Sequence, residues 1–132
     1  MLFVTGLARY CKCRSADLEA EGCSCSCAAQ GAEAGGHHAY FLADIDDSLV
    51  GTFALVATIR AAVDLPVIAA GGIMDGRGVA AALALGAAAA QMGTAFLLSD
   101  EAIISQAWRG AIETASDDPT RLTRALTGRY AR

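Results

Sequence analysis

The chain has 132 residues, of which 55% are hydrophobic and only 18% charged, and its formal net charge is −4. These proportions exclude a disordered tail, because disordered segments are polar and highly charged. The length predicts one domain. The basic residues are scattered along the chain, so we expect no nucleic-acid partner.

The first 29 residues are rich in cysteine. We expect a short helix over residues 15–22 and a strand over residues 23–29 that leads into Gln30. The spacing is Cys-x-Cys, unlike the Cys-x-x-Cys of zinc sites, at Cys11, Cys13, Cys23, Cys25 and Cys27. Alternate strand residues share a face, so the last three thiols should be buried together, with a soft-metal site as the alternative. No signal peptide is recognisable, which predicts a reducing, cytoplasmic environment without a disulfide framework.

A helix and a strand are predicted in the middle of the chain. Residues 52–63 have apolar side chains one turn apart, and Thr52 is the expected N-cap. Asp64-Leu65-Pro66 ends this helix. The uninterrupted apolar run Val67–Ala70 predicts a strand that is buried on both faces of a sheet.

The next helix and strand lie in a stretch without charge. Asp75 should cap a helix over residues 76–85, and Gly86 should end it. A strand follows over residues 87–92. The uncharged run from Gly78 to Ser99 is long enough to cross a membrane. A helix, a glycine stop and a buried strand explain it better, because most of the run is weakly hydrophobic alanine.

The last predicted helix begins at Ser99 as N-cap and runs to about Ala115. Its apolar positions should face the core: Ile103, Ala107, Trp108 and Ala111. Strands and helices therefore alternate along the chain, which predicts right-handed βαβ units and a parallel sheet. In such α/β folds, ligands bind at the carboxyl ends of the strands.

Each predicted strand ends in residues suited to ligand binding. The three strand ends read Gln30–His37, Ala69–Gly78 and Gln91–Thr94. Glycine turns expose backbone N–H groups that can hold a phosphate without a lysine, which matters because Lys12 is the only lysine. The sequence therefore allows an anionic cofactor at this edge of the sheet.

His37 is the candidate catalytic residue. It is either a surface-loop histidine or a general base, a role that suits an imidazole because it titrates near neutral pH. Glu33 is expected to be an ion-pair partner or a solvated loop residue. We expect Asp75 and Arg77 to cap and brace a helix start.

These motifs, in this order, resemble the nitronate monooxygenase family, also called 2-nitropropane dioxygenase-like flavoproteins. The resemblance extends from about Gln30 to Arg132, although the family usually has Arg-Gly where this chain has His38-Ala39. It implies an FMN-dependent (β/α)8 TIM barrel that oxidises alkyl nitronates and nitroalkanes with O2 to carbonyl compounds and nitrite. By position, His37 falls on the catalytic base. The positions implied to bind FMN are Gln30, Gly35, Gly36, Gly71, Gly72, Gln91, Met92, Gly93 and Thr94.

The resemblance also implies that the chain is the C-terminal portion of the barrel, because a closed barrel takes about 250 residues. We expect a poorly matching, cysteine-rich segment over residues 1–29 and an FMN-binding half-barrel of about four βα units over residues 30–132. An FMN-dependent enoyl-acyl-carrier-protein reductase or NAD(P)H:quinone reductase is an alternative activity. A non-catalytic half-barrel is the alternative of another class; it would fold on association with itself or a partner, through its open edge.

Overall fold

A computed structural model describes residues 7–10, 26–38, 49–115 and 120–132. The predicted helix over residues 15–22 lies outside these ranges. So do four of the five cysteines, namely Cys11, Cys13, Cys23 and Cys25. The interpretation of the cysteine-rich segment therefore stays a prediction, apart from Cys27.

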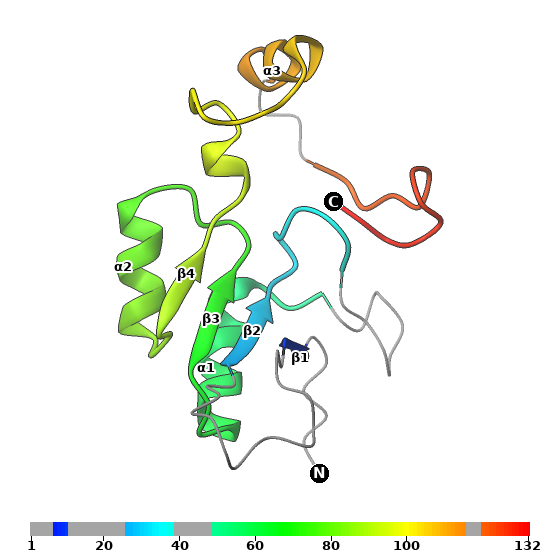
Figure 1. The fold of residues 1–132 in the computed structure, drawn as a ribbon. Coiled ribbons are helices and arrows are strands. Elements are labelled where there is room, and N and C mark those ends of the chain that lie inside the picture. The colour runs from blue at the N-terminus through cyan, green and yellow to red at the C-terminus, as the bar shows by residue number, and fades with distance from the viewer. Residues whose placement is uncertain (1–6, 11–25, 39–48, 116–119) are drawn as a thin grey trace, which may run out of the picture.

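The described strands form one sheet in the order β1-β2-β3-β4 (Figure 1). Strands β2 (Ser26–Gln30), β3 (Val67–Ala70) and β4 (Ala89–Gln91) are parallel, as predicted. Strand β1 (Leu7–Tyr10) is antiparallel to β2 and lies at the edge of the sheet. The described ranges thus hold three parallel strands, where about four βα units were expected.

Two helices connect the parallel strands. Helix α1 (Thr52–Ala62) joins β2 to β3, and α2 (Gly76–Ala84) joins β3 to β4. Helix α1 lies against β2 and β3, α2 lies against β4, and the two helices contact each other. They therefore cover the same face of the sheet, which is the βαβ arrangement that the sequence predicted.

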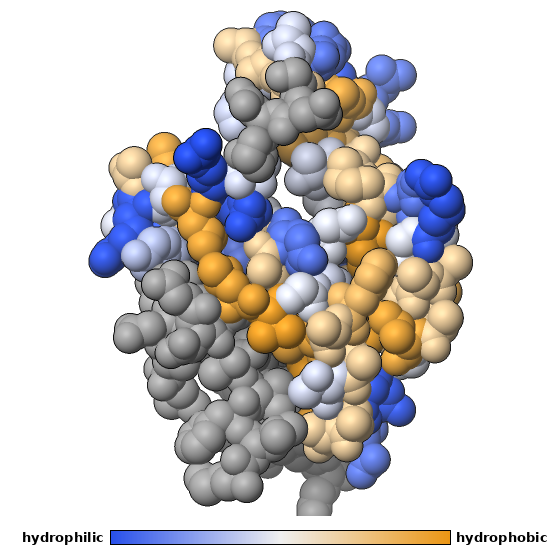
Figure 2. All heavy atoms as spheres, turned by 180° about the vertical axis from the view of Figure 1, so that it is seen from behind, coloured by the Kyte–Doolittle hydropathy of each residue, from blue (hydrophilic) through white to orange (hydrophobic). Residues whose placement is uncertain are grey.

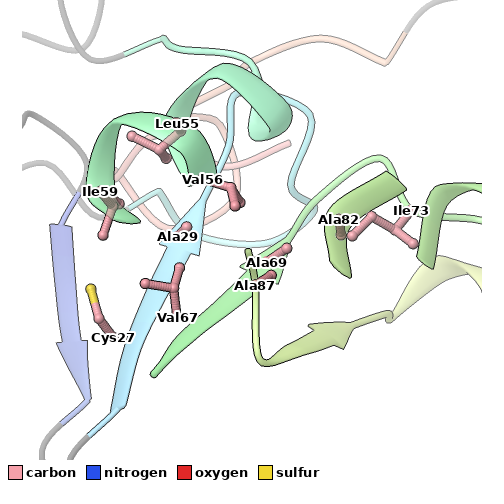
Figure 3. Packing of buried hydrophobic residues seen from close by; sticks show 10 residues of the cluster. All are labelled: Cys27, Ala29, Leu55, Val56, Ile59, Val67, Ala69, Ile73, Ala82 and Ala87. Carbon is pink, nitrogen blue, oxygen red and sulfur yellow. The ribbon is translucent and has the colours of Figure 1, made fainter. Parts of the chain in front are cut away.

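The core lies between these helices and the sheet (Figure 3). Helix α1 contributes Leu55, Val56 and Ile59, which are almost fully buried. The strands meet them with small side chains, which allow close approach; buried at this interface are Cys27, Ala29, Val67 and Ala69. Cys27 is only 1% exposed, which agrees with the interpretation of a small buried thiol.

The opposite face of the sheet is not fully covered. In β3, Val67 and Ala69 are buried, whereas Ile68 and Ala70 are only partly buried. Strand β2 has the same alternation. The prediction that Val67–Ala70 is buried on both faces was therefore wrong for this chain, because the helices of the described part cover one face only.

The start and end of α2 confirm the sequence prediction. The Asp75 carboxylate accepts hydrogen bonds from the backbone N–H groups of Arg77 and Gly78, at 2.9 and 3.1 Å. It also accepts hydrogen bonds from the Arg77 guanidinium, and the shortest N–O distance is 2.6 Å. Gly86 has a φ of +91° just after the helix, where glycine is favoured. The uncharged stretch thus contains a helix, a stop and a strand. None of the described helices is both long and apolar enough to cross a bilayer.

The last helix exists and ends near the predicted residue, but the predictions of its start and of its buried face were wrong. Helix α3 (Gln106–Glu113) begins after Ser105, whose side chain accepts a hydrogen bond from the Trp108 N–H at 3.2 Å. Ser99 instead lies in turns that follow the 3-10 helix η2 (Thr94–Phe96). None of the residues expected to face the core is buried: Ile103, Ala107, Trp108 and Ala111.

Residues 97–115, which we call the α3 lobe, extend away from the sheet (Figure 1). From behind, the lobe lies above the body of the molecule and exposes hydrophobic side chains (Figure 2). Arg109 fixes α3 to the preceding turn through hydrogen bonds to the carbonyl oxygens of Leu98 and Ser99. Apolar spacing predicted a buried face here, but no residue of α3 is buried in the described part of the chain.

Candidate functional site

The loops after β2, β3 and β4 meet at one edge of the sheet. A Cβ atom added to Gly71 would lie 2.7 Å from the Ala34 nitrogen, and Gly71 has a φ of +112°. A Cβ on Gly35 would lie 3.8 Å from the Thr94 side-chain oxygen. The three glycine-bearing strand ends singled out in the sequence are thus neighbours, as parallel topology requires.

A buried threonine ties the first two of these loops to α1. The Thr52 hydroxyl lies 2.9 Å from the Glu33 carboxylate and 2.9 Å from the Gly71 carbonyl oxygen. The Thr52 backbone N–H also donates to Glu33, at 3.0 Å. Gly31 is required beside this group, because a Cβ there would lie 2.0 Å from Thr52 Oγ1.

These contacts correct the predicted cap of α1 and add a role for Glu33. Thr52 is the first residue of α1, and the N-cap is Gly51, which makes no side-chain capping bond. The carboxylate of Glu33 satisfies the first backbone N–H of the helix instead, from a loop 19 residues away. Glu33 is thus an exposed loop residue, as expected, whose carboxylate also caps α1.

His37 lies on the loop after β2, with its side chain exposed. Its Nε2 atom is 2.7 Å from the Thr127 hydroxyl oxygen. Its backbone carbonyl accepts a hydrogen bond from the Gln30 side-chain amide at 2.9 Å, so Gln30 holds the loop rather than facing away from it. The candidate base is therefore held at both its backbone and its ring.

The C-terminal segment (residues 120–132) supports the same loop. The backbones of Gly36 and Arg132 exchange two hydrogen bonds, at 2.8 and 3.1 Å, and His38 N–H donates to the Tyr130 carbonyl. His37 lies opposite Ala131 in this antiparallel pairing. Residues about 90 positions apart in sequence thus build one side of the site.

His38 is the buried neighbour of His37, with 5% of its surface exposed. Burial lowers the pKa of His38 below its ordinary value of 6.5, and the positive charge of Arg132 lowers it further. A hydrogen bond with the Ala34 backbone opposes both effects. Its Nε2 atom has no hydrogen-bond partner within the described ranges.

Backbone N–H groups around these loops are suited to an anionic ligand. Among the described residues, no hydrogen bond engages the amide N–H of Gly72, Gly93 or Thr94, and all three residues are exposed. Unpaired amides at the ends of parallel strands can bind a phosphate. The described residues include no group of His, Cys, Asp or Glu side chains placed to hold a metal ion.

Sequence reasoning missed the roles of Thr52, Thr127 and Arg132. The polar strand ends predicted the loops, but no local pattern indicated which distant side chains would support them. Thr127 belongs to the Thr127-Gly128-Arg129 string that carried part of the family resemblance, and that string was the available signal.

Parallel strands joined by helices, with glycine loops and a histidine at their carboxyl ends, define an α/β protein with a ligand site at the carboxyl edge of its sheet. The family profile described as Nitronate monooxygenase matches residues 16–132. The chain belongs to the nitronate monooxygenase family.

Curated relatives agree with this assignment. The nitronate monooxygenase of Paraburkholderia phytofirmans is 50% identical over 118 residues, which cover 89% of this chain and 32% of the relative. That of Pseudomonas aeruginosa is 52% identical over 104 residues, covering 79% of this chain and 30% of the relative. The chain therefore spans about a third of the length of the curated relatives it matches.

Solved structures show the same partial coverage. A nitroalkane oxidase from Streptomyces ansochromogenes has 49% identity and a TM-score of 0.72, over 79% of this chain and 30% of that one. FabK from Thermotoga maritima has 45% identity and a TM-score of 0.64, with the same coverage. The fold class predicted from the sequence, a portion of a TIM barrel, is thereby confirmed. The division of the chain at Gln30 stays a prediction.

Proposed function

We propose that this chain carries the FMN-binding and proton-abstracting part of a nitronate monooxygenase. The reaction converts alkyl nitronates or nitroalkanes and O2 into carbonyl compounds and nitrite. One observation carries the proposal: the loop that holds exposed His37 meets the glycine loops after β3 and β4 at one edge of the sheet. Membership of the family supports the same substrate class.

In this proposal, His37 removes the acidic proton next to the nitro group, because a ring nitrogen of a neutral imidazole can accept it. The exposed position of the side chain leaves it accessible to a small substrate. A substrate that is already a nitronate has lost this proton, so it needs no base.

FMN would be held by residues from all three loops: Gln30, Gly35, Gly36, Gly71, Gly72, Gln91, Met92, Gly93 and Thr94. The amides of Gly72, Gly93 and Thr94 fit a phosphate group, since they are exposed and uncommitted within the described part of the chain. When bound, FMN would supply the electron acceptor that couples substrate oxidation to O2.

A pair of glycine variants tests the cofactor site without disturbing the fold. A Cβ added to Gly93 or to Gly110 meets nothing within 4 Å. Gly93→Ala places a methyl group beside the proposed phosphate position, whereas Gly110→Ala lies in α3. In titrations that follow quenching of FMN fluorescence, we expect Gly93→Ala to weaken binding about tenfold and Gly110→Ala to leave it unchanged. Equal affinities, or no binding by the unaltered chain, would contradict the proposed site.

Nitrite release tests the base. We expect His37→Gln to lower turnover of 2-nitropropane about 100-fold or more, because general bases contribute at least that much. Propyl nitronate provides the internal control, since its oxidation needs no proton removal. Full activity of the variant toward 2-nitropropane would exclude His37 as the base. Bleaching of bound flavin by NADH, without nitrite release, would favour the reductase alternative.

The non-catalytic alternative also has an observation in its favour. Ile68 and Ala70 are incompletely covered, and the α3 lobe exposes Trp108 and Ile103. Such surfaces favour self-association through the open edge of the barrel. Sedimentation velocity at increasing chain concentration tests this alternative. Concentration-dependent association without FMN binding would support a half-barrel that has no catalytic role of its own.

A further inference from the structure

The two ring nitrogens of His37 have different surroundings. Nε2 lies 2.7 Å from Thr127 Oγ1. No described residue forms a hydrogen bond with Nδ1. The hydroxyl thus occupies one side of an otherwise exposed imidazole and leaves the other nitrogen open.

Hydrogen bonds that involve the backbone hold both partners in this contact. The Gln30 amide and the Gly36–Arg132 hydrogen bonds fix the loop on the side of His37. On the other side, the Arg129 N–H donates to Thr127 Oγ1 at 3.4 Å, within a turn of the C-terminal segment. The contact therefore joins two anchored segments rather than two free side chains.

We propose that Thr127 is the positioning residue of His37, and that Nδ1 is the atom that takes the substrate proton. This inference rests on the function proposed above. A neutral imidazole carries one proton, and a base at Nδ1 requires that this proton lie on Nε2. Thr127 Oγ1 then accepts it in a hydrogen bond, which fixes both the tautomer and the ring orientation.

The same hydrogen bond serves the proton transfer. The C–H bond next to the nitro group breaks, its electron pair stays with the substrate as the nitronate, and a new N–H bond forms at Nδ1. The resulting imidazolium still donates from Nε2 to Thr127, now in a stronger, charge-assisted bond. A base at Nε2 would require the Thr127 hydroxyl to move away before the substrate could approach.

Imidazole nitrogen chemical shifts of the 15N-labelled chain test the tautomer directly. The chain has two histidines, so a His38→Phe spectrum assigns them. We expect the Nε2–H tautomer for His37 and the same tautomer in Thr127→Ser. In Thr127→Val the tautomer ratio should change about fivefold toward Nδ1–H, because the variant loses one neutral hydrogen bond and such a bond changes an equilibrium by about that factor. Thr58→Val, on the exposed face of α1, is the matched control. An Nδ1–H tautomer in the unaltered chain, or no change in Thr127→Val, would overturn the proposal.

Turnover separates this proposal from the one on which it rests. Thr127→Val should lower kcat for 2-nitropropane about tenfold while leaving propyl nitronate oxidation unchanged. Thr127→Ser keeps the hydroxyl and should therefore keep the kcat of the unaltered chain. Equal losses on both substrates would contradict a role in proton removal. If the unaltered chain releases no nitrite from either substrate, the proposed function fails, while the tautomer ratio, measured without flavin or substrate, still decides whether Thr127 orients His37.

Discussion

Helices α1 and α3 show two different ways in which a helix is stabilised. Helix α1 lacks a capping side chain at its N-cap, Gly51, yet buries Leu55, Val56 and Ile59. Helix α3 has a capping serine and buries no residue. Packing stabilises the first and local hydrogen bonds the second. The βαβ core and the α3 lobe should therefore respond differently to the same kind of substitution.

Truncating one isoleucine in each region should give the largest difference. Ile59 is fully buried, so Ile59→Ala should lower the free energy of unfolding by about 3 kcal/mol through lost burial and a new cavity. Ile103 is 102% exposed, and Ile103→Ala should change it by less than about 0.5 kcal/mol. Urea unfolding followed by far-UV circular dichroism measures both values. Similar losses would show that the α3 lobe packs in solution.

The threonine between α1 and the site loops should have the next largest effect. Thr52→Val removes the hydroxyl between Glu33 and the Gly71 carbonyl. Glu33 keeps the backbone N–H of residue 52 as a donor, whereas the partly buried Gly71 carbonyl loses its side-chain partner. We expect a loss of about 2 kcal/mol in the free energy of unfolding. Thr58→Val, on the exposed side of the same helix, should change little. Equal midpoints in urea for the two variants would exclude a structural role for the hydroxyl.

His38 should give the core a pH dependence that the α3 lobe does not share. Because its pKa is lowered on folding, the unfolded chain binds more protons below about pH 6.5. The contribution of neutral His38 to the free energy of unfolding is thus complete above about pH 6.5 and decreases as pH falls toward the lowered pKa. Between about pH 7.5 and about pH 5.5, His38→Phe should lose less stability in urea than the unaltered chain. Parallel losses would rule out His38 as the source.

Removing one cap from each region should give the smallest effects. Asp75→Ala removes the cap of α2, which packs on the core, so the urea midpoint should decrease measurably. Ser105→Ala removes the cap of α3, and we expect only faster amide hydrogen exchange at Trp108. A decrease in the global midpoint for Ser105→Ala would connect the α3 lobe to the cooperative core.

The core could be predicted from the sequence because its signals are local. The run Val67–Ala70, the Asp75 cap and the Gly86 stop each indicate their structure within a few residues. The α3 lobe could not be predicted in this way, because both Ser99 and Ser105 are good N-caps. Apolar spacing also does not indicate whether another element packs against the apolar face of the helix. The incompletely covered face of β3 escaped prediction for the same reason.

The candidate site divides in a similar way. Parallel topology places the glycine loops together, so their meeting followed from strand order alone. The contacts of Glu33 with Thr52 and of His37 with Thr127 join positions 19 and 90 residues apart. Such contacts depend on how loops pack across the edge of the sheet, and no spacing within the sequence indicates them.

The position of the one tryptophan has a practical consequence for spectroscopy. Trp108 lies on α3 and is 57% exposed, so intrinsic fluorescence reports on the α3 lobe and not on the core between α1 and the sheet. Tryptophan emission would therefore not report the unfolding of the core. The same isolation makes Trp108 a built-in optical probe: a polypeptide that covers the lobe should shift its emission to shorter wavelength and protect it from iodide quenching.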